Sequence, residues 1–228
     1  MSASFRVISI GTLAANPFWN ERGSVRAAHA TTTLILSGDA RILVDPSLPA
    51  QILLPKLAER SGLQPEQITH VFLTCFSPIH RRAIASFESA QWLIAERERE
   101  AIGQQLVAKF HEARGAGDTE LLAAITPEIA VLERTKAAPD ALGKGVDLFP
   151  LCGVSPGLSG LLLPGRTATV LIAGDAVPTL EHLEGGQVLT PCFDLEMARA
   201  SLGEAAEIAD WIVCGRDNVL PNPTRRPF

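Results

Sequence analysis

Short apolar runs bounded by Gly, Pro, Asn or Asp dominate the first and last thirds of the chain, and this pattern is typical of β-strands. In the first part, the pattern predicts strands at 5–13, 31–36, 41–44, 69–74 and 91–95. In the last third, it predicts strands at 146–151, 159–163 and 167–173, and a final strand at 211–213. The strands fall into two groups along the chain, and this grouping indicates two sheets.

Apolar positions at helical spacing predict helices at 50–60 and 194–209, with Gly62 ending the first and Asp194 capping the second. A short helix is expected at 80–87. The predicted buried faces comprise Ile52, Leu53, Leu54, Leu57 and Ala58 in the first helix, and Leu195, Ala198, Leu202, Ala205 and Ile208 in the last.

The middle of the chain, at about 96–145, is predicted to be a helical insertion. A helix is predicted over 96–114, and Asp118 can cap a short one over 119–125; residues 126–145 have no clear assignment. The alternating charges at 96–100 indicate a solvated helix face. Two strand-rich halves, each closed by helices, predict one α/β domain built as a four-layer αββα sandwich.

Composition limits the classes of partner. Of the 228 residues, 46% are hydrophobic and 20% are charged, as in ordinary folded proteins, and the net charge of −5 with scattered basic residues argues against nucleic acid. No apolar run reaches membrane-spanning length and no signal-peptide core is present, so a cytoplasmic protein without a membrane contact is expected. The four widely spaced cysteines form no CxxC pair and indicate reduced thiols.

The strand at 69–74 delivers short polar side chains to its carboxyl end, where open α/β sheets bind ligands. The residues that follow it resemble the metal-binding loop of the metallo-β-lactamase superfamily, T-H-x-H-x-D-H after a hydrophobic strand. Thr74 and His80 match this motif, whereas Cys75, Ser77 and Ile79 stand at the two other His positions and the Asp position.

Further stretches resemble the same family, in its order and over almost the whole chain. Residues 151–157 resemble the T-P-G-H-T-P-G loop with Val154 at the His, and 171–176 resemble the L-x-x-G-D strand end with Asp175 intact. Residues 212–217 resemble the closing V-P-G-H-D motif with Arg216 at the His, and 42–47 match the L-V-D-P-G strand end. The resemblance implies the same αββα fold.

The resemblance also implies two divalent ions that activate water, and this chain has lost most of their ligands. Of seven ligand positions, only His80 and Asp175 keep the family's residue. Val and Ile cannot ligate, and Arg216 brings a fixed positive charge. We therefore expect no metal cofactor. We also predict that Arg216 forms an ion pair with Asp175 close to His80; the alternative is that Arg216 turns outward to solvent.

The thiols leave alternatives open. Cys75 is expected to be a packed, unreactive residue, but it could serve as a nucleophile activated by His80. It could also hold a single zinc or iron ion together with His80 and Asp175. Cys152 and Cys214 lie beside two of the lost ligands, so a site of three thiolates is a further alternative.

These features predict a degenerate pocket under the polar loop 16–28, in which Phe18 and Trp19 either cover a ligand or pack ordinarily. The pocket is expected to comprise Cys75, Ser77, Ile79, His80, Val154, Asp175 and Arg216, with Phe18 and Trp19 above it. The favoured function is a non-catalytic binding or structural role, with a small-molecule ligand in the pocket or self-association through helices at 96–125 as the open partner classes. The alternative is a hydrolase with an atypical single-metal or thiol-based site at Cys75, His80 and Asp175.

Overall fold

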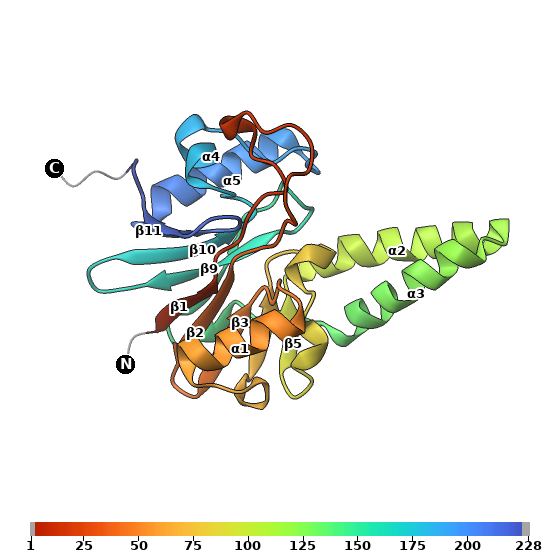
Figure 1. Ribbon diagram of the computed structural model, residues 1–228, viewed down its shortest axis with the longest axis horizontal. Coiled ribbons are helices and arrows are strands. Elements are labelled where there is room, and N and C mark those ends of the chain that lie inside the picture. Colours follow the sequence, from red (N-terminus) through yellow and green to blue (C-terminus); the bar gives the residue numbers. More distant parts are fainter. Residues whose placement is uncertain (1–2, 225–228) are drawn as a thin grey trace.

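The computed structural model describes residues 3–224 as two mixed six-stranded sheets packed face to face, with helices outside both (Figure 1). The predicted αββα sandwich is confirmed. The first sheet has the order β1 (Ser4–Ser9), β2 (Thr32–Ser37), β3 (Ala40–Val44), β4 (His70–Leu73), β5 (Gln91–Ile94) and β6 (Lys136–Ala137). The second has the order β12 (Val219–Pro221), β11 (Trp211–Cys214), β10 (Thr169–Gly174), β9 (Ser159–Pro164), β8 (Val146–Pro150) and β7 (Ala141–Gly143).

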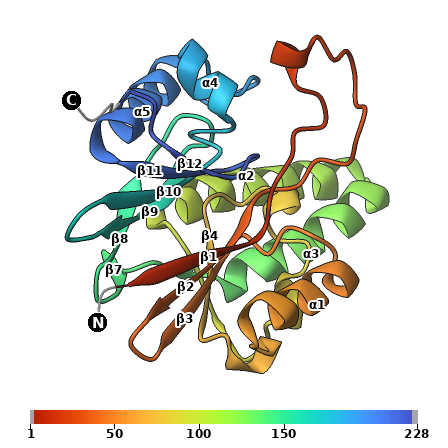
Figure 2. The ribbon, with the colours of Figure 1, turned by 60° about the vertical axis from the view of Figure 1, so that its left-hand side comes forward.

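Helix α1 (Ala50–Ser61) lies against the first sheet, and α4 (Leu180–Gly185) and α5 (Leu195–Ile208) lie on the side of the second (Figure 2). Alternation along the central strands explains the layers, because successive side chains point to opposite faces. On β4, Val71 packs in the cluster under α1, whereas Phe72 packs between the sheets against second-sheet residues such as Ile172 and Val213. Strands buried on both faces are uniformly apolar, as the sequence is at these positions.

The sheets bring their functional ends to one edge. Strands β3, β4 and β5 run parallel, so the residues that follow them emerge together, and β10 and β11 are also parallel. The Ser159 backbone N–H donates to the Thr74 carbonyl at 3.0 Å, which joins the end of β4 to the start of β9. The loops after β3, β4, β10 and β11 therefore meet where the two sheets touch.

The insertion forms a two-helix arm that extends away from the sheets (Figure 1). Its helices are α2 (Glu96–Ala116) and α3 (Thr119–Arg134), and β6 and β7 follow at 136–143. The prediction that the second helix ends near Ile125 was wrong: α3 continues through Pro127. The Thr126 hydroxyl donates to the Leu122 carbonyl at 2.7 Å, one turn earlier, and α3 packs along α2. The self-association expected on this arm stays a prediction.

Three smaller expectations were also wrong. Instead of a helix over 80–87, the structure has two 3₁₀ turns, Pro78–His80 and Ile84–Ser86, because the segment bends back and the Ala83 N–H donates to the Pro46 carbonyl. Strand β12 follows β11, so 211–213 is not the final strand. The ends of two predicted helix faces are exposed, namely Ile52, Leu195 and Ile208. None of the helices within residues 3–224 is long and apolar enough to cross a membrane.

Candidate functional site

The candidate site is a buried cluster of charged side chains where the strands of both sheets end. Asp45 follows β3, Asp175 follows β10 and Arg216 follows β11. Two glycines allow these ends to approach closely. Gly174 has a φ of +55°, and a Cβ there would lie 2.8 Å from the Thr74 Cβ; a Cβ at Gly215 would lie 2.5 Å from the Gly174 carbonyl oxygen.

Arg216 and Asp175 form a two-point ion pair inside the protein. The Arg216 Nε donates to Asp175 Oδ1 at 2.7 Å, and Nη2 donates to Oδ2 at 2.6 Å. Both residues are 5% exposed. The predicted Arg216–Asp175 pair is confirmed, and the alternative of an outward-facing Arg216 is wrong. A planar guanidinium suits this geometry because its N–H groups match both oxygens of a carboxylate.

His80 lies between two carboxylates and is fully buried. Its Nδ1 is 3.0 Å from Asp45 Oδ2, and its Nε2 is 3.0 Å from Asp175 Oδ2. The Arg216 Nη2 is also 3.0 Å from the His80 Nε2. The side chains of Arg216, Asp175, His80 and Asp45 therefore form one continuous network across the two sheets.

The charges of this network balance. Burial by itself lowers the pKa of His80, but the Asp175 and Asp45 carboxylates at its two ring nitrogens outweigh burial and raise that pKa well above its ordinary value. Burial raises the pKa of Asp175, but the cations Arg216 and His80 dominate and hold it well below the usual carboxyl range. The protonated His80 and the Arg216 guanidinium carry two positive charges, and the Asp45 and Asp175 carboxylates carry two negative charges.

Asp45 is a site residue that the sequence reasoning did not single out. Its Oδ1 accepts the Thr74 N–H at 2.9 Å, its Oδ2 accepts the Thr74 hydroxyl at 2.6 Å, and the same Oδ2 contacts His80. Asp45 has a φ of +48°, a strained conformation for a residue with a side chain. The signal for it was its place at a strand end inside one of the matching motifs.

Cys75 is buried, at 4% exposure, within an apolar cluster around β10 and β11. Burial raises the pKa of its thiol, although the charge of His80 opposes the change. Potential ligand atoms of Cys75, His80 and Asp175 lie within 4.8 Å of one another, and this is the single such group among residues 3–224. Cys152 and Cys214 are outside it, so the expected alternative of a three-thiolate site was wrong.

The predicted pocket residues Ser77 and Ile79 precede His80 in the loop after β4, and Val154 lies in the loop after β8. The Ser77 carbonyl accepts the His80 N–H at 3.0 Å, and the Ile79 carbonyl accepts the Ser47 hydroxyl. Val154 packs against the apolar cluster beneath α5, and its carbonyl accepts the Phe193 N–H at 3.2 Å. These three residues contribute backbone bonds and packing rather than side-chain ligands.

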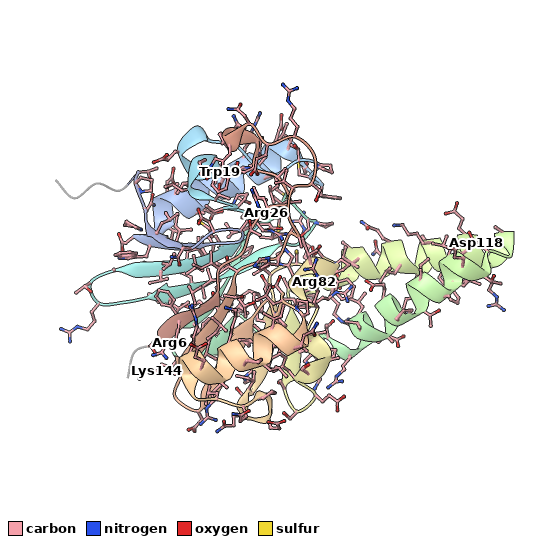
Figure 3. All side chains as sticks on the ribbon, viewed as in Figure 1. Arg6, Trp19, Arg26, Arg82, Asp118 and Lys144 are labelled. Atoms are coloured by element: carbon pink, nitrogen blue, oxygen red, sulfur yellow. The ribbon has the colours of Figure 1, made fainter. Side chains whose placement is uncertain are left out.

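Phe18 and Trp19 belong to the loop between β1 and β2, which reaches α4. The Phe18 ring lies edge-on to the buried His182 ring, with centroids 4.9 Å apart, and the Trp19 Nε1 donates to Glu181 Oε1 at 2.7 Å. Figure 3 shows Trp19 beside α4, with Arg26 of the same loop nearby. These contacts hold the loop on the second sheet's helices, where Trp19 remains 58% exposed.

The expectation that the charges at 96–100 form a solvated face was wrong for Glu98. It is 1% exposed, and its carboxylate accepts the Phe76 N–H at 3.0 Å, the Ser155 hydroxyl at 2.9 Å and the Gly157 N–H at 2.8 Å. Burial of a carboxylate is tolerated when several donors satisfy it. Helix α2 therefore anchors the two loops that correspond to the metal-binding motifs.

The chain resembles known proteins in its three-dimensional structure. No known family profile matches the chain, and no curated protein matches its sequence. A Thermotoga maritima protein assigned to the metallo-β-lactamases superposes with a TM-score of 0.69 at 18% identity, covering 97% of this chain and 100% of its own. AidC, a dizinc quorum-quenching lactonase, gives 0.67 at 17% identity over 98% of this chain and 86% of its own, and the hydrolase AbOPH gives 0.64 at 17% over 100% and 93%.

The chain has the metallo-β-lactamase fold. The superpositions span nearly the full length of both partners, as the order of the sequence motifs implied. At this identity, the likeness establishes the fold and leaves the chemistry to this chain's own residues.

On this metallo-β-lactamase fold, the residues present do not fit a two-metal centre. Both oxygens of Asp175 accept hydrogen bonds from Arg216, whose guanidinium also contacts the His80 Nε2. A cation placed there would meet a fixed positive charge and would have to displace it. Val154 and Ile79, at two other ligand positions, offer no side-chain donor atoms.

Proposed function

We propose that this protein is a non-catalytic member of the metallo-β-lactamase fold in which an ion network replaces the metal centre, and that it acts by binding or in a structural role. One observation carries the proposal: the Arg216 guanidinium is hydrogen-bonded to both oxygens of Asp175 at 2.7 and 2.6 Å and lies 3.0 Å from His80 Nε2. His80 and Asp175 stand at the two ligand positions that keep the family's own residue.

The network supports this proposal energetically. Removing both metal ions from a site built for them would leave buried carboxylates without a compensating positive charge. Each such buried charge is unfavourable by roughly several kcal/mol. Arg216 and the imidazolium of His80 supply two positive charges against Asp175 and Asp45. The site is thus electrically satisfied by the chain's own residues.

The structural neighbours supply the contrast. They are hydrolases by name, and AidC is a dizinc lactonase. A water molecule can be activated in such sites because the ions keep an open coordination position. In this chain, the groups at the corresponding centre face one another, and His80, Asp175 and Arg216 are each at most 5% exposed.

The second candidate is a hydrolase with a single zinc or iron ion, or a thiol nucleophile, at Cys75, His80 and Asp175. It is favoured by the convergence of their ligand atoms within 4.8 Å. For metal binding, Arg216 would have to leave Asp175; for thiol catalysis, Cys75 would have to ionise although burial raises its pKa.

Elemental analysis of protein purified without chelators, together with hydrolase assays on lactone and β-lactam substrates, tests the proposal. The expected result is less than about 0.1 equivalent of zinc, iron or manganese and no turnover above the buffer rate. One tightly held ion that Cys75→Ser releases would establish the second candidate instead. Two ions per chain would refute the proposal outright.

A further inference from the structure

A small cavity lies beside the network, between the loop that follows β1 and the start of α4. Its volume is about 80 Å³. Its lining includes Trp19, Arg26, Thr179, Glu181, Arg216 and Asp217. Figure 3 shows Trp19 and Arg26 on this side of the molecule, on the loop that forms the outer wall.

Arg216 connects this cavity to the buried network. Its Nε and Nη2 face Asp175 and His80, while its Nη1 is buried and has no hydrogen-bond partner within the described part of the chain. Arg216 also lines the cavity, and within residues 3–224 Nη1 is the guanidinium nitrogen that the network leaves without an acceptor. A buried donor without an acceptor is unfavourable, so this position selects for an oxygen acceptor such as a carboxylate or carbonyl.

The rest of the lining carries both signs of charge. Arg26, which is paired with Glu21, adds a second guanidinium, and Glu181 and Asp217 add two carboxylates. Burial alone raises the pKa of Glu181, but hydrogen bonds from Thr179, its own backbone, Trp19 and Asn16 outweigh this effect and keep the pKa below its ordinary value. A simple anion would therefore meet two carboxylates, and a simple cation would meet two guanidinium groups.

We propose that this cavity binds a small zwitterion of the α-amino acid type, with its carboxylate on Arg216 Nη1 and Arg26 and its ammonium group on Glu181 and Asp217. Such a ligand satisfies both signs of charge and the unpaired donor at once. The small volume restricts it to the smallest members of the class, of which glycine and L-alanine are the simplest. The inference rests on the proposed function, since it requires Arg216 to remain held by Asp175.

Isothermal titration with glycine and L-alanine, compared with acetate and methylammonium, tests this inference. The two half-molecules carry one charge each and should bind at least about tenfold more weakly than the zwitterions, because each leaves charged lining groups unpaired. Arg216→Lys keeps a positive charge for Asp175 but removes Nη1, and Glu181→Gln removes one carboxylate. Each should weaken zwitterion binding by about tenfold or more, whereas the exposed Arg82→Ala should leave it unchanged.

Three results would overturn the inference: no saturable binding of either amino acid, acetate binding as tightly as glycine, or full binding by a folded Glu181→Gln variant. Glu181 is only partly buried, so its variant provides the test even if Arg216→Lys fails to fold. Metal analysis of the same preparation separates the two proposals. Metal-free protein without binding refutes only the amino acid site, whereas protein with two bound ions refutes the proposed function as well.

Discussion

The Arg216 guanidinium donates two hydrogen bonds to the Asp175 carboxylate, with Nε–Oδ1 and Nη2–Oδ2 distances of 2.7 and 2.6 Å. Arg216 comes from the strand end after β11 and Asp175 from the end of the neighbouring parallel strand β10. The pair is therefore set by the topology of the second sheet, and it connects through His80 to Asp45 on the first sheet.

Replacing Arg216 with Ala should destabilise the protein by about 3 kcal/mol, because it leaves the buried Asp175 carboxylate without its main cationic partner. Urea denaturation at neutral pH measures the effect. The matched control is Arg82→Ala, which removes an exposed Arg and should change the unfolding free energy by less than about 0.5 kcal/mol. Equal effects of the two substitutions would show that the Arg216 pair adds nothing to stability.

Arg216→His should not confer hydrolysis, since four other ligand positions remain substituted.

The network predicts a stability maximum in mildly acidic solution. The pKa of Asp175 is lowered on folding, so its contribution is present above the unfolded carboxyl pKa of about 3.9 and is lost as the pH falls. The pKa of His80 is raised on folding, so its contribution is complete below the unfolded pKa of about 6.5 and declines as the pH rises toward the folded value. Between about pH 6.5 and 8, stability should therefore fall by up to about 1.4 kcal/mol per pH unit.

The control for the alkaline decline is His80→Gln, which retains an amide near both carboxylates but cannot titrate. Urea denaturation curves collected from pH 5 to 8 should show a flatter profile for this variant than for the wild type. Identical slopes would mean that His80 carries no extra proton in the folded state.

Cys75 should behave as a protected thiol. Its burial and raised pKa predict that a thiol reagent labels the partly exposed Cys192 first and reaches Cys75 only on unfolding. Mass spectrometry of native protein after brief labelling identifies the modified residue, and Cys192→Ser should abolish the fast phase. Rapid, stoichiometric labelling of Cys75 near pH 6 would favour thiol catalysis instead.

Glu98 should be the residue of its charge run whose side chain matters most to stability. Glu98→Gln exchanges one carboxylate oxygen for an amide NH₂, which faces backbone N–H donors and should destabilise by about 1–3 kcal/mol. Glu100→Gln, exposed on the same helix, is the matched control and should be nearly neutral. The difference between the two unfolding free energies measures how firmly α2 holds the motif loops.

The ordered motifs predicted the fold and the Arg216–Asp175 contact, because strand ends and their following residues are local sequence features that the topology then brings together. Asp45 and Glu98 were not anticipated, because their roles depend on contacts that no local sequence feature indicates. Asp45 becomes a site residue only through a turn with positive φ that directs its carboxylate to Thr74 and His80. Glu98 resembles its solvated neighbours in sequence, and only the packing of α2 on two distant loops buries it.

Helix ends and surface faces were predicted least well. The continuation of α3 through Pro127 depends on packing against α2, which local propensity cannot express. The docking of Phe18 and Trp19 on α4 likewise depends on a helix that the sequence pattern did not reveal.

Anomalous scattering at the zinc edge, from crystals of this protein grown with excess zinc, tests directly whether Arg216 has replaced the metal centre. We expect no anomalous peak between Cys75 Sγ, His80 Nε2 and Asp175 Oδ2, and an Arg216 guanidinium still within hydrogen-bonding distance of both Asp175 oxygens. A zinc peak at that position, with Arg216 displaced from Asp175, would contradict it.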